Sequence, residues 1–142
     1  MNKIKFYFFI FLFAFFFANK GIGKDSYLLE GKKLFSEKKF SESKFKFEQD
    51  IVFNPKSEEA YLYLAKIFKE EENDDLQEQN LDTVILLNPQ NEEAVYLLAL
   101  LKMKKSDYEE SGKLIKNFNK ICKVLCEKKS DLNTKLKSLQ TK

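Results

Sequence analysis

The sequence predicts an all-α fold, built as an array of helical hairpins, and two observations predict it. Two Asn-Pro steps, Asn54-Pro55 and Asn88-Pro89, lie 34 residues apart in a chain of 142 residues. The segments that begin at these prolines are nearly the same, PKSEEAYLYLA and PQNEEAVYLLA. A period of this length is typical of stacked helical hairpins rather than of a single enclosed core.

Other positions keep the same register. Residues that are all small, or all large and apolar, recur at steps of 34. These sets are Gly31, Ala65 and Ala99; Tyr27, Tyr61 and Val95; and Phe53, Leu87 and Ile121. We therefore expect each unit to contain a first helix (helix A) that packs closely against a second (helix B) around the small residue.

The helix ends follow from local chemistry. Proline cannot continue a helix and pushes the residue before it out of the helical region, so each Asn-Pro step ends a helix B. Ser57 and Asn91 suit the N-cap position, and the Glu pairs that follow them suit the positive end of the helix dipole. Helices A are predicted near residues 25–36, 58–72 and 92–105, helices B near 40–53, 75–87 and 108–121, and a closing helix near 126–139.

The closing helix has one apolar stripe. Leu125, Leu132, Leu136 and Leu139 follow one another at spacings of 7, 4 and 3 residues, and lysines lie off the stripe. A last helix with one wet face is what a repeat array requires for solubility.

These positions resemble the tetratricopeptide repeat (TPR). Its unit has a large residue early, a small one in helix A, an aromatic opening helix B and a terminal Pro. The third unit matches most clearly, at residues 94–99 and 106–111, and the first has Phe40 and Pro55 in place. The resemblance implies a right-handed superhelical solenoid of three antiparallel hairpins, at about residues 24–57, 58–91 and 92–123. A C-terminal capping helix and tail follow at 124–142.

Some positions depart from the family pattern. Ser43, Gln77 and Ser111 stand where the family prefers a small Ala. Gln77 is the largest of the three, so we expect it to loosen the second hairpin. The third unit has Cys122-Lys123 in place of a terminal Pro, as expected where an array stops.

The resemblance also implies a binding surface, because TPR helices A line a concave groove that takes an extended or helical peptide. By position this groove contains Leu28, Lys32, Phe35, Leu62, Lys66, Lys69, Tyr96, Leu100 and Met103. Lys32 and Lys66 hold equivalent slots and suit acidic groups along a ligand. Ordinary packing between helices is the alternative for each apolar residue, and a solvated side chain is the alternative for each Lys. The family's carboxylate-clamp pattern needs Asn beside Lys on helices A, and this sequence lacks it.

The first 23 residues read as a signal peptide, with an N-terminal anchor as the alternative. A basic lead is followed by an apolar run of 13 residues from Phe6 to Ala18. A bilayer span needs about 20 apolar residues, whereas the core of a signal peptide needs about 7–15. Gly21 and Gly23 suit cleavage before Lys24. Lys, Phe and Asn are abundant and Arg is absent, as in an AT-rich bacterial genome. The expected location is the periplasm, or the inner membrane if the segment is retained.

The charge balance excludes some partners. After residue 23 the chain is neutral, which argues against a nucleic-acid binder. Residues 24–57 carry 8 Lys and 6 acidic residues, 58–101 carry 2 and 11, and 102–142 carry 12 and 5. The resulting charges of +2, −9 and +7 can orient a partner or a second copy of the chain. Chance segregation on a solvated surface is the alternative.

Cys122 and Cys126 are the only cysteines. In an exported chain we expect them to pair. Residues four apart in a continuous helix have Cβ atoms about 5–6 Å apart, and a disulfide requires about 3.5–4.5 Å. A bond therefore requires a bend between helix B of the third unit and the closing helix. The alternative is two reduced cysteines within one continuous helix.

The sequence predicts a non-catalytic adaptor that binds a peptide or protein segment. His is absent, and there is no Gly-rich phosphate loop, nucleophile elbow or metal-ligand spacing, so no enzyme, cofactor or metal is expected. The alternative is a self-associating or membrane-tethered structural subunit of a cell-envelope assembly.

Overall fold

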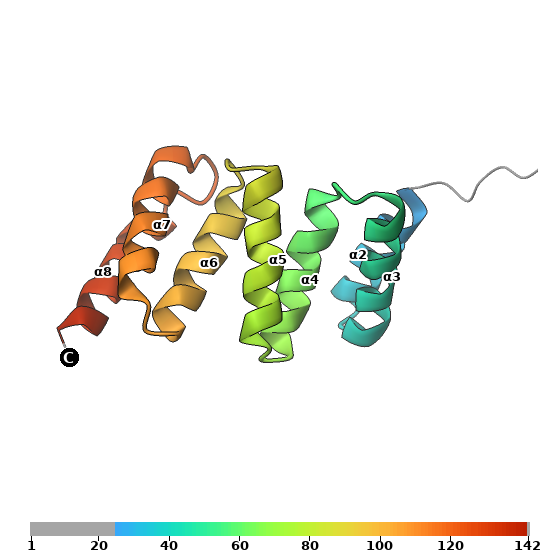
Figure 1. Ribbon diagram of the computed structural model, residues 1–142, viewed down its shortest axis with the longest axis horizontal. Coiled ribbons are helices and arrows are strands. Elements are labelled where there is room, and N and C mark those ends of the chain that lie inside the picture. Colours follow the sequence, from blue (N-terminus) through green and yellow to red (C-terminus); the bar gives the residue numbers. More distant parts are fainter. Residues whose placement is uncertain (1–24, 142) are drawn as a thin grey trace, which may run out of the picture.

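The computed structural model describes residues 25–141, which form seven helices joined by short turns, with no strand among them (Figure 1). The helices are α2 (Asp25–Ser36), α3 (Phe40–Phe53), α4 (Glu58–Glu70), α5 (Asp74–Leu87), α6 (Glu92–Lys104), α7 (Tyr108–Ile121) and α8 (Lys128–Gln140). Their ends agree with the predicted ranges to within two residues. The all-α fold class is confirmed.

The helices pack as successive antiparallel hairpins, α2 with α3, α4 with α5 and α6 with α7, and α8 packs on α7 and α6 (Figure 1). We call α2, α4 and α6 the A-type helices and α3, α5 and α7 the B-type helices. The B-type helices all run in one direction and the A-type helices in the other. The ends of the B-type helices therefore meet the starts of the A-type helices at one edge of the array.

Three hydrophobic clusters make up the core, two of them between neighbouring hairpins and one between the third hairpin and α8. The cluster between the first two hairpins contains Phe47, Ala60, Leu64, Ile67 and Phe68. The cluster between the second and third contains Leu62, Ala65, Leu81, Val84, Ala94, Leu98 and Leu101. The last contains Val95, Ala99, Met103, Ile115, Phe118 and Leu132. Because each cluster draws on two neighbouring parts of the array, each hairpin depends on the next hairpin or on α8 for burial.

The predicted stripe of the closing helix packs as expected. Leu132 is fully buried in the last cluster, and Leu125, Leu136 and Leu139 pack against it. The array thus ends on a helix that has one apolar face and one face of charged side chains.

The turn from each A-type helix to its B-type partner has the same backbone form. Lys38, Glu72 and Ser106 have φ of 59°, 55° and 61°, and they lie 34 residues apart. In the first of these turns the N–H of Lys39 donates to the carbonyl of Leu34 (3.0 Å). This is the Schellman arrangement, in which Gly is the usual left-handed residue. No Gly marks these turns in the sequence.

Two of the serines that depart from the family pattern are buried donors. The Ser43 hydroxyl donates to the Gly31 carbonyl (2.8 Å), and the Ser111 hydroxyl donates to the Ala99 carbonyl (3.0 Å). Each bond joins helix B to the small residue of helix A in the same hairpin. Gln77, at the equivalent position of the second hairpin, is also buried.

The two predicted N-caps differ. The Asn91 side chain accepts a hydrogen bond from the N–H of Ala94 (2.8 Å) and caps α6 as expected. Ser57 occupies the N-cap position of α4 but makes no cap hydrogen bond with its side chain. Asn73 and Asp107 cap α5 and α7 through their side chains, which the sequence analysis did not identify.

None of the helices within residues 25–141 is both long and apolar enough to cross a bilayer. The predicted signal peptide or anchor, residues 1–23, lies outside the described residues.

Candidate functional site

The candidate site is the accessible surface of the A-type helices, which we call the A face. It is formed by seven side chains at repeated positions of α2, α4 and α6. These are Leu29, Lys32, Tyr63, Lys66, Lys69, Leu97 and Leu100. Ion pairs and aromatic contacts join these helices across the face.

Lys32 and Lys66, the two lysines in equivalent slots, are each paired with the following unit. Lys32 donates to Glu59 of α4, and Lys66 lies 2.8 Å from Glu93 of α6. Donation to the Glu59 carboxylate raises the pKa of the Lys32 ammonium above its ordinary value. The sequence analysis expected these two lysines to face acidic groups of a ligand. In the structure Glu59 and Glu93 of the chain itself pair with them. The lysines therefore brace neighbouring helices.

Tyr63 lies between these two lysines. The Lys66 ammonium is 4.8 Å from the centre of the Tyr63 ring, and that of Lys32 is 5.9 Å away. The ring stacks on Phe47 and meets Phe35 edge-on, with both centroid distances at 5.0 Å. Cations over an aromatic face and rings around its edge hold Tyr63 in one orientation. Tyr63 is thus a fixed aromatic platform in the middle of the A face.

The other predicted groove residues divide between surface and core. Leu62 and Met103 are buried, with 8% and 3% exposed. Leu62 packs in the cluster between the second and third hairpins, and Met103 in the cluster closed by α8. Leu28 and Phe35 are half-buried and pack against the first cluster. Tyr96 packs against Phe118 with ring centres 5.8 Å apart. These residues therefore pack between helices, which was the alternative to a role in the groove.

Two hollows lie on the A face. The first, of about 660 Å³, is lined by α2 and α4 through Ser26, Leu29, Glu30, Lys32, Lys33 and Tyr63. The second, of about 410 Å³, is lined by Lys69, Glu72, Gln77, Leu97, Leu100, Leu101, Lys104 and Lys135. Lys69 and Leu100 are predicted groove residues that lie in the second hollow, and Lys32 lies in the first.

Several A-face residues were missed by the sequence analysis. Leu29, Tyr63 and Leu97 are 34 residues apart, so the period itself contained the signal for them. They are the neighbours of the positions chosen from the family pattern. Lys135 belongs to the capping helix, and nothing in the repeat period links it to the second hollow.

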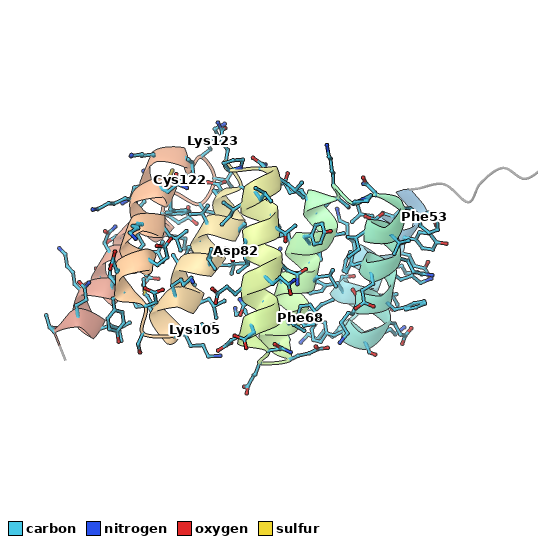
Figure 2. All side chains as sticks on the ribbon, viewed as in Figure 1. Phe53, Phe68, Asp82, Lys105, Cys122 and Lys123 are labelled. Carbon is cyan, nitrogen blue, oxygen red and sulfur yellow. A yellow bond between two sulfur atoms is a disulfide. The ribbon has the colours of Figure 1, made fainter. Side chains whose placement is uncertain are left out.

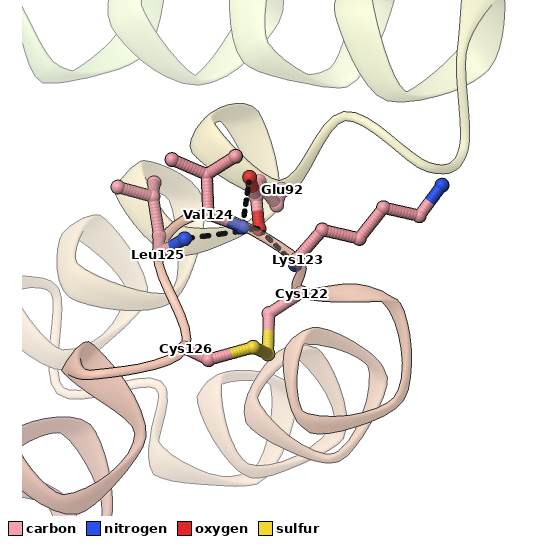
Figure 3. Close-up of a disulfide and its surroundings, with 6 residues drawn as sticks. All are labelled: Glu92, Cys122, Lys123, Val124, Leu125 and Cys126. Atoms are coloured by element: carbon pink, nitrogen blue, oxygen red, sulfur yellow. Dashed lines mark hydrogen bonds between the residues drawn. A yellow bond between two sulfur atoms is a disulfide. The ribbon is translucent and has the colours of Figure 1, made fainter.

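The third unit ends in a disulfide-closed turn in place of Asn-Pro. Cys122 and Cys126 are bonded, with their Cα atoms 5.3 Å apart, and the chain bends between α7 and α8 (Figure 3). The backbone N–H groups of Lys123, Val124 and Leu125 donate to the Glu92 carboxylate at 2.6–3.2 Å. These bonds, chiefly that from Lys123, lower the pKa of Glu92.

Glu58 has the equivalent role in the second unit. Its carboxylate accepts hydrogen bonds from the side-chain amides of Asn88 (2.9 Å) and Asn91 (2.5 Å), which flank the Asn-Pro turn. Glu58 and Glu92 are 34 residues apart. Each therefore fixes the turn that follows the B-type helix of its own unit. Side-chain amides supply the donors in one unit, and the backbone of the disulfide loop supplies them in the other.

Within residues 25–141, no group of three or more His, Cys, Asp or Glu side chains is arranged to hold a metal ion. Two acidic residues at the turn after α4, Glu71 and Asp74, instead form ion pairs. Lys44 pairs with Glu71 (2.7 Å) and Lys104 with Asp74 (2.6 Å).

No family model and no curated protein matches the chain in sequence. Solved structures do match its fold. The Yersinia enterocolitica type III secretion chaperone SycD, in complex with a peptide of the translocator YopD, is similar with a TM-score of 0.72 and 11% identity, covering 82% of this chain and 92% of that one. The first TPR of Spaghetti (RPAP3), bound to the HSP90 peptide SRMEEVD, has a TM-score of 0.73 and 14% identity, with coverages of 82% and 95%.

The Sgt2 TPR domain of Aspergillus fumigatus has a TM-score of 0.71 and 12% identity, covering 84% of this chain and 82% of that domain. At these identities the likeness concerns the fold. It agrees with the 34-residue register, the three hairpins and the capping helix described above. The chain folds as a tetratricopeptide-repeat solenoid of three helical hairpins closed by a capping helix.

Proposed function

We propose that the protein is a non-catalytic adaptor that holds a peptide or protein segment on its A face. The observation that carries this proposal is the row of accessible side chains on the A face, with one hollow lined by Tyr63 and a second lined by Lys69, Leu97 and Leu100. An aromatic platform flanked by leucines offers apolar area at low entropic cost. The exposed lysines of the two hollows, Lys33 and Lys69, supply polar contacts.

The fold relatives support the same class of function. The similar SycD structure holds a YopD peptide, that of the first RPAP3 repeat domain holds an HSP90 peptide, and a third similar chain belongs to the CopN–Scc3 complex. These three proteins have the same fold and hold a protein or peptide. The ligand chemistry is taken from this chain and not from those relatives. Lys32 and Lys66, in equivalent slots of the A face, are already paired with Glu59 and Glu93.

The proposal places the protein in the bacterial periplasm. The apolar run from Phe6 to Ala18, with its basic lead, supports export. The Cys122–Cys126 disulfide supports an oxidising compartment.

A matched pair of variants tests the binding surface. Leu29→Asp places a charge on the A face, where Leu29 is 71% exposed, and Phe45→Asp does so on α3, where Phe45 is 57% exposed. Crosslinking in the native compartment followed by mass spectrometry measures the partners retained. We expect Leu29→Asp to lose the partner at least tenfold and Phe45→Asp to keep it. Equal retention in the two variants would reject the A face as the binding surface.

A further inference from the structure

Gln77 is the one polar side chain in the lining of the second hollow that is almost fully buried. It lies in the first turn of α5 and is 4% exposed. Among the neutral side chains of this helix, Asn80 and Thr83 donate to carbonyls of the helix itself, whereas the Gln77 side chain forms no hydrogen bond with any residue of 25–141. A buried amide without hydrogen bonds costs stability, so its two N–H donors and its carbonyl call for a partner.

The equivalent residues of the other two hairpins find their partners inside the fold. Ser43 and Ser111 donate to the carbonyl of the small residue on their own helix A, at 2.8 and 3.0 Å. In the second hairpin that carbonyl belongs to Ala65, and Gln77 does not donate to it. The longer side chain of Gln77 lines the second hollow instead.

The Gln77 amide opens onto the hollow. Within residues 25–141, the side-chain atoms that are enclosed without a hydrogen bond belong to Gln49, Asp50 and Asn119, and those of Gln77 are not among them. Gln77 lines a hollow of about 410 Å³ on the A face. Its donors and its acceptor are therefore within reach of a group that enters the hollow from this face.

Leucines of α6 form the apolar wall beside Gln77. Leu97 and Leu100 are half-buried and Leu101 is 3% exposed, so the first two offer most of the apolar area to a ligand. A mainly apolar wall with a few well-placed polar groups is typical of binding pockets, in which the polar groups fix the orientation of the ligand.

The rim of the hollow carries charged side chains of both signs, which are Lys69, Glu72, Lys104 and Lys135. Lys104 is paired with Asp74 at 2.6 Å. The lysine stems add apolar surface while their ammonium groups reach water. Figure 2 shows Phe68 and Lys105, the sequence neighbours of two rim lysines, toward the lower edge of the array, where the A-type helices end. Because the rim is mixed in charge, the buried amide is the group that distinguishes one ligand from another.

We propose that the second hollow binds one neutral apolar residue of the partner segment, and that Gln77 hydrogen-bonds a peptide group beside that residue. A peptide group has one N–H and one carbonyl, so it satisfies both the carbonyl and an N–H of the amide. A carboxylate only accepts, and it would leave the Gln77 carbonyl without a donor. The apolar side chain lies against Leu97 and Leu100. This inference rests on the proposed function and adds the class of residue that the A face takes.

N-acetyl-L-leucinamide is a suitable probe, because it carries one apolar side chain between two amide groups. A ligand of this size is expected to bind the full chain with a Kd on the order of a few millimolar. NMR shifts of the Gln77 side-chain amide and of the Leu97 and Leu100 methyl groups measure it. N-acetylglycinamide, which lacks the apolar side chain, is expected to cause no shift. No shift with the leucine probe, or equal binding of the two probes, overturns the proposal.

A matched pair of variants tests the role of the amide. Gln77→Met keeps the length of the side chain and removes its hydrogen bonds, and Gln79→Met makes the same change at an exposed position outside the hollow. We expect Gln77→Met to weaken binding of the leucine probe about tenfold, with no loss of thermal stability, and Gln79→Met to leave binding unchanged. Gln77→Ser, which copies the other two hairpins, is expected to fold and to bind as weakly as Gln77→Met. Equal binding by the Gln77 and Gln79 variants overturns the proposal.

The same variants in cells separate this inference from the proposed function. A photoreactive amino acid at Leu29, in the first hollow, reports a partner on the A face. We expect Gln77→Met to lower the yield of adducts severalfold and Gln79→Met to keep it. A yield that Gln77→Met leaves unchanged overturns this inference and leaves the proposed function standing. The absence of adducts from the unmodified chain rejects the proposed function, and the probe measurement still decides what the hollow binds.

Discussion

Gly31 and Phe47 show how the size of one residue depends on the residue opposite it in the hairpin. A Cβ at Gly31 would lie 2.7 Å from the Phe47 ring, which is fully buried. The equivalent positions in the later hairpins are Ala65 and Ala99. There the residues 34 and 68 positions after Phe47 are the smaller Leu81 and Ile115. In each hairpin, therefore, a smaller residue on helix A is matched by a larger one on helix B, and the combined volume of the two stays similar from one hairpin to the next.

The surroundings of Gly31 and Gly112 lead to opposite predictions for their replacement by Ala. Gly31→Ala is expected to destabilise the fold by about 1–3 kcal/mol, because the buried ring must move. Gly112→Ala, where the nearest atom of Leu136 is 3.8 Å from the new Cβ, is expected to stabilise by about 0.5–1 kcal/mol through helix propensity. Urea denaturation followed by circular dichroism measures both. Stabilisation by both substitutions would contradict the close approach at Gly31.

Glu92 gives the stability a dependence on pH. Its pKa is lowered in the folded state by the N–H groups of residues 123–125, so its stabilising effect is full above the ordinary Glu pKa and is lost as pH falls through the lowered value. Glu92→Gln is expected to cost on the order of 1–2 kcal/mol at pH 7. This cost should shrink below about pH 4.3.

The matched control for Glu92 is Glu93→Gln, which removes the exposed ion pair with Lys66. It is expected to cost about 0.5 kcal/mol or less. Thermal unfolding across pH 3–7 distinguishes the two variants. A cost of Glu92→Gln that stays constant down to pH 3 would contradict the role given to its carboxylate.

At the scale of elements, the disulfide turn and α8 form one closing unit. Cys122 and Cys126 close a loop whose backbone binds Glu92, and Leu132 of α8 completes the last core cluster. The turn thus holds α8 at the angle from which its leucines reach the third hairpin.

Replacing both cysteines by Ser is expected to act mainly on this unit. Chain entropy for a closed loop of five residues corresponds to about 2 kcal/mol. We expect hydrogen exchange to accelerate in α8 and the end of α7, while the amides of α4 and α5 keep their protection. Uniform acceleration along the array would show that the bond acts on the whole chain instead.

For the whole molecule, the 34-residue register allowed the seven helices and the apolar stripe of the closing helix to be predicted from the sequence. Asn-Pro steps, small residues and leucine spacing are local signals, because each determines the structure at its own position in the sequence. The A-to-B turns were not predicted as Schellman turns because Lys38, Glu72 and Ser106 carry no Gly signal.

The candidate site was predicted less completely, for a physical reason. The pairing of Lys32 with Glu59 and of Lys66 with Glu93 joins residues 27 apart on different helices. Such contacts depend on how successive units are rotated, and the period alone does not contain that rotation. The same rotation buries Leu62 and brings Lys135 to the second hollow.

The central claim is that the A face holds the partner, and site-specific photocrosslinking tests it most directly. The photoreactive amino acid benzoylphenylalanine is placed at Leu29 or Leu97 on the A face, or at Phe45 or Leu76 on the B-type helices, in cells that make the full chain. The account predicts adducts of the same mass from both A-face positions and none from the other two. Adducts that form only from Phe45 or Leu76 would contradict it.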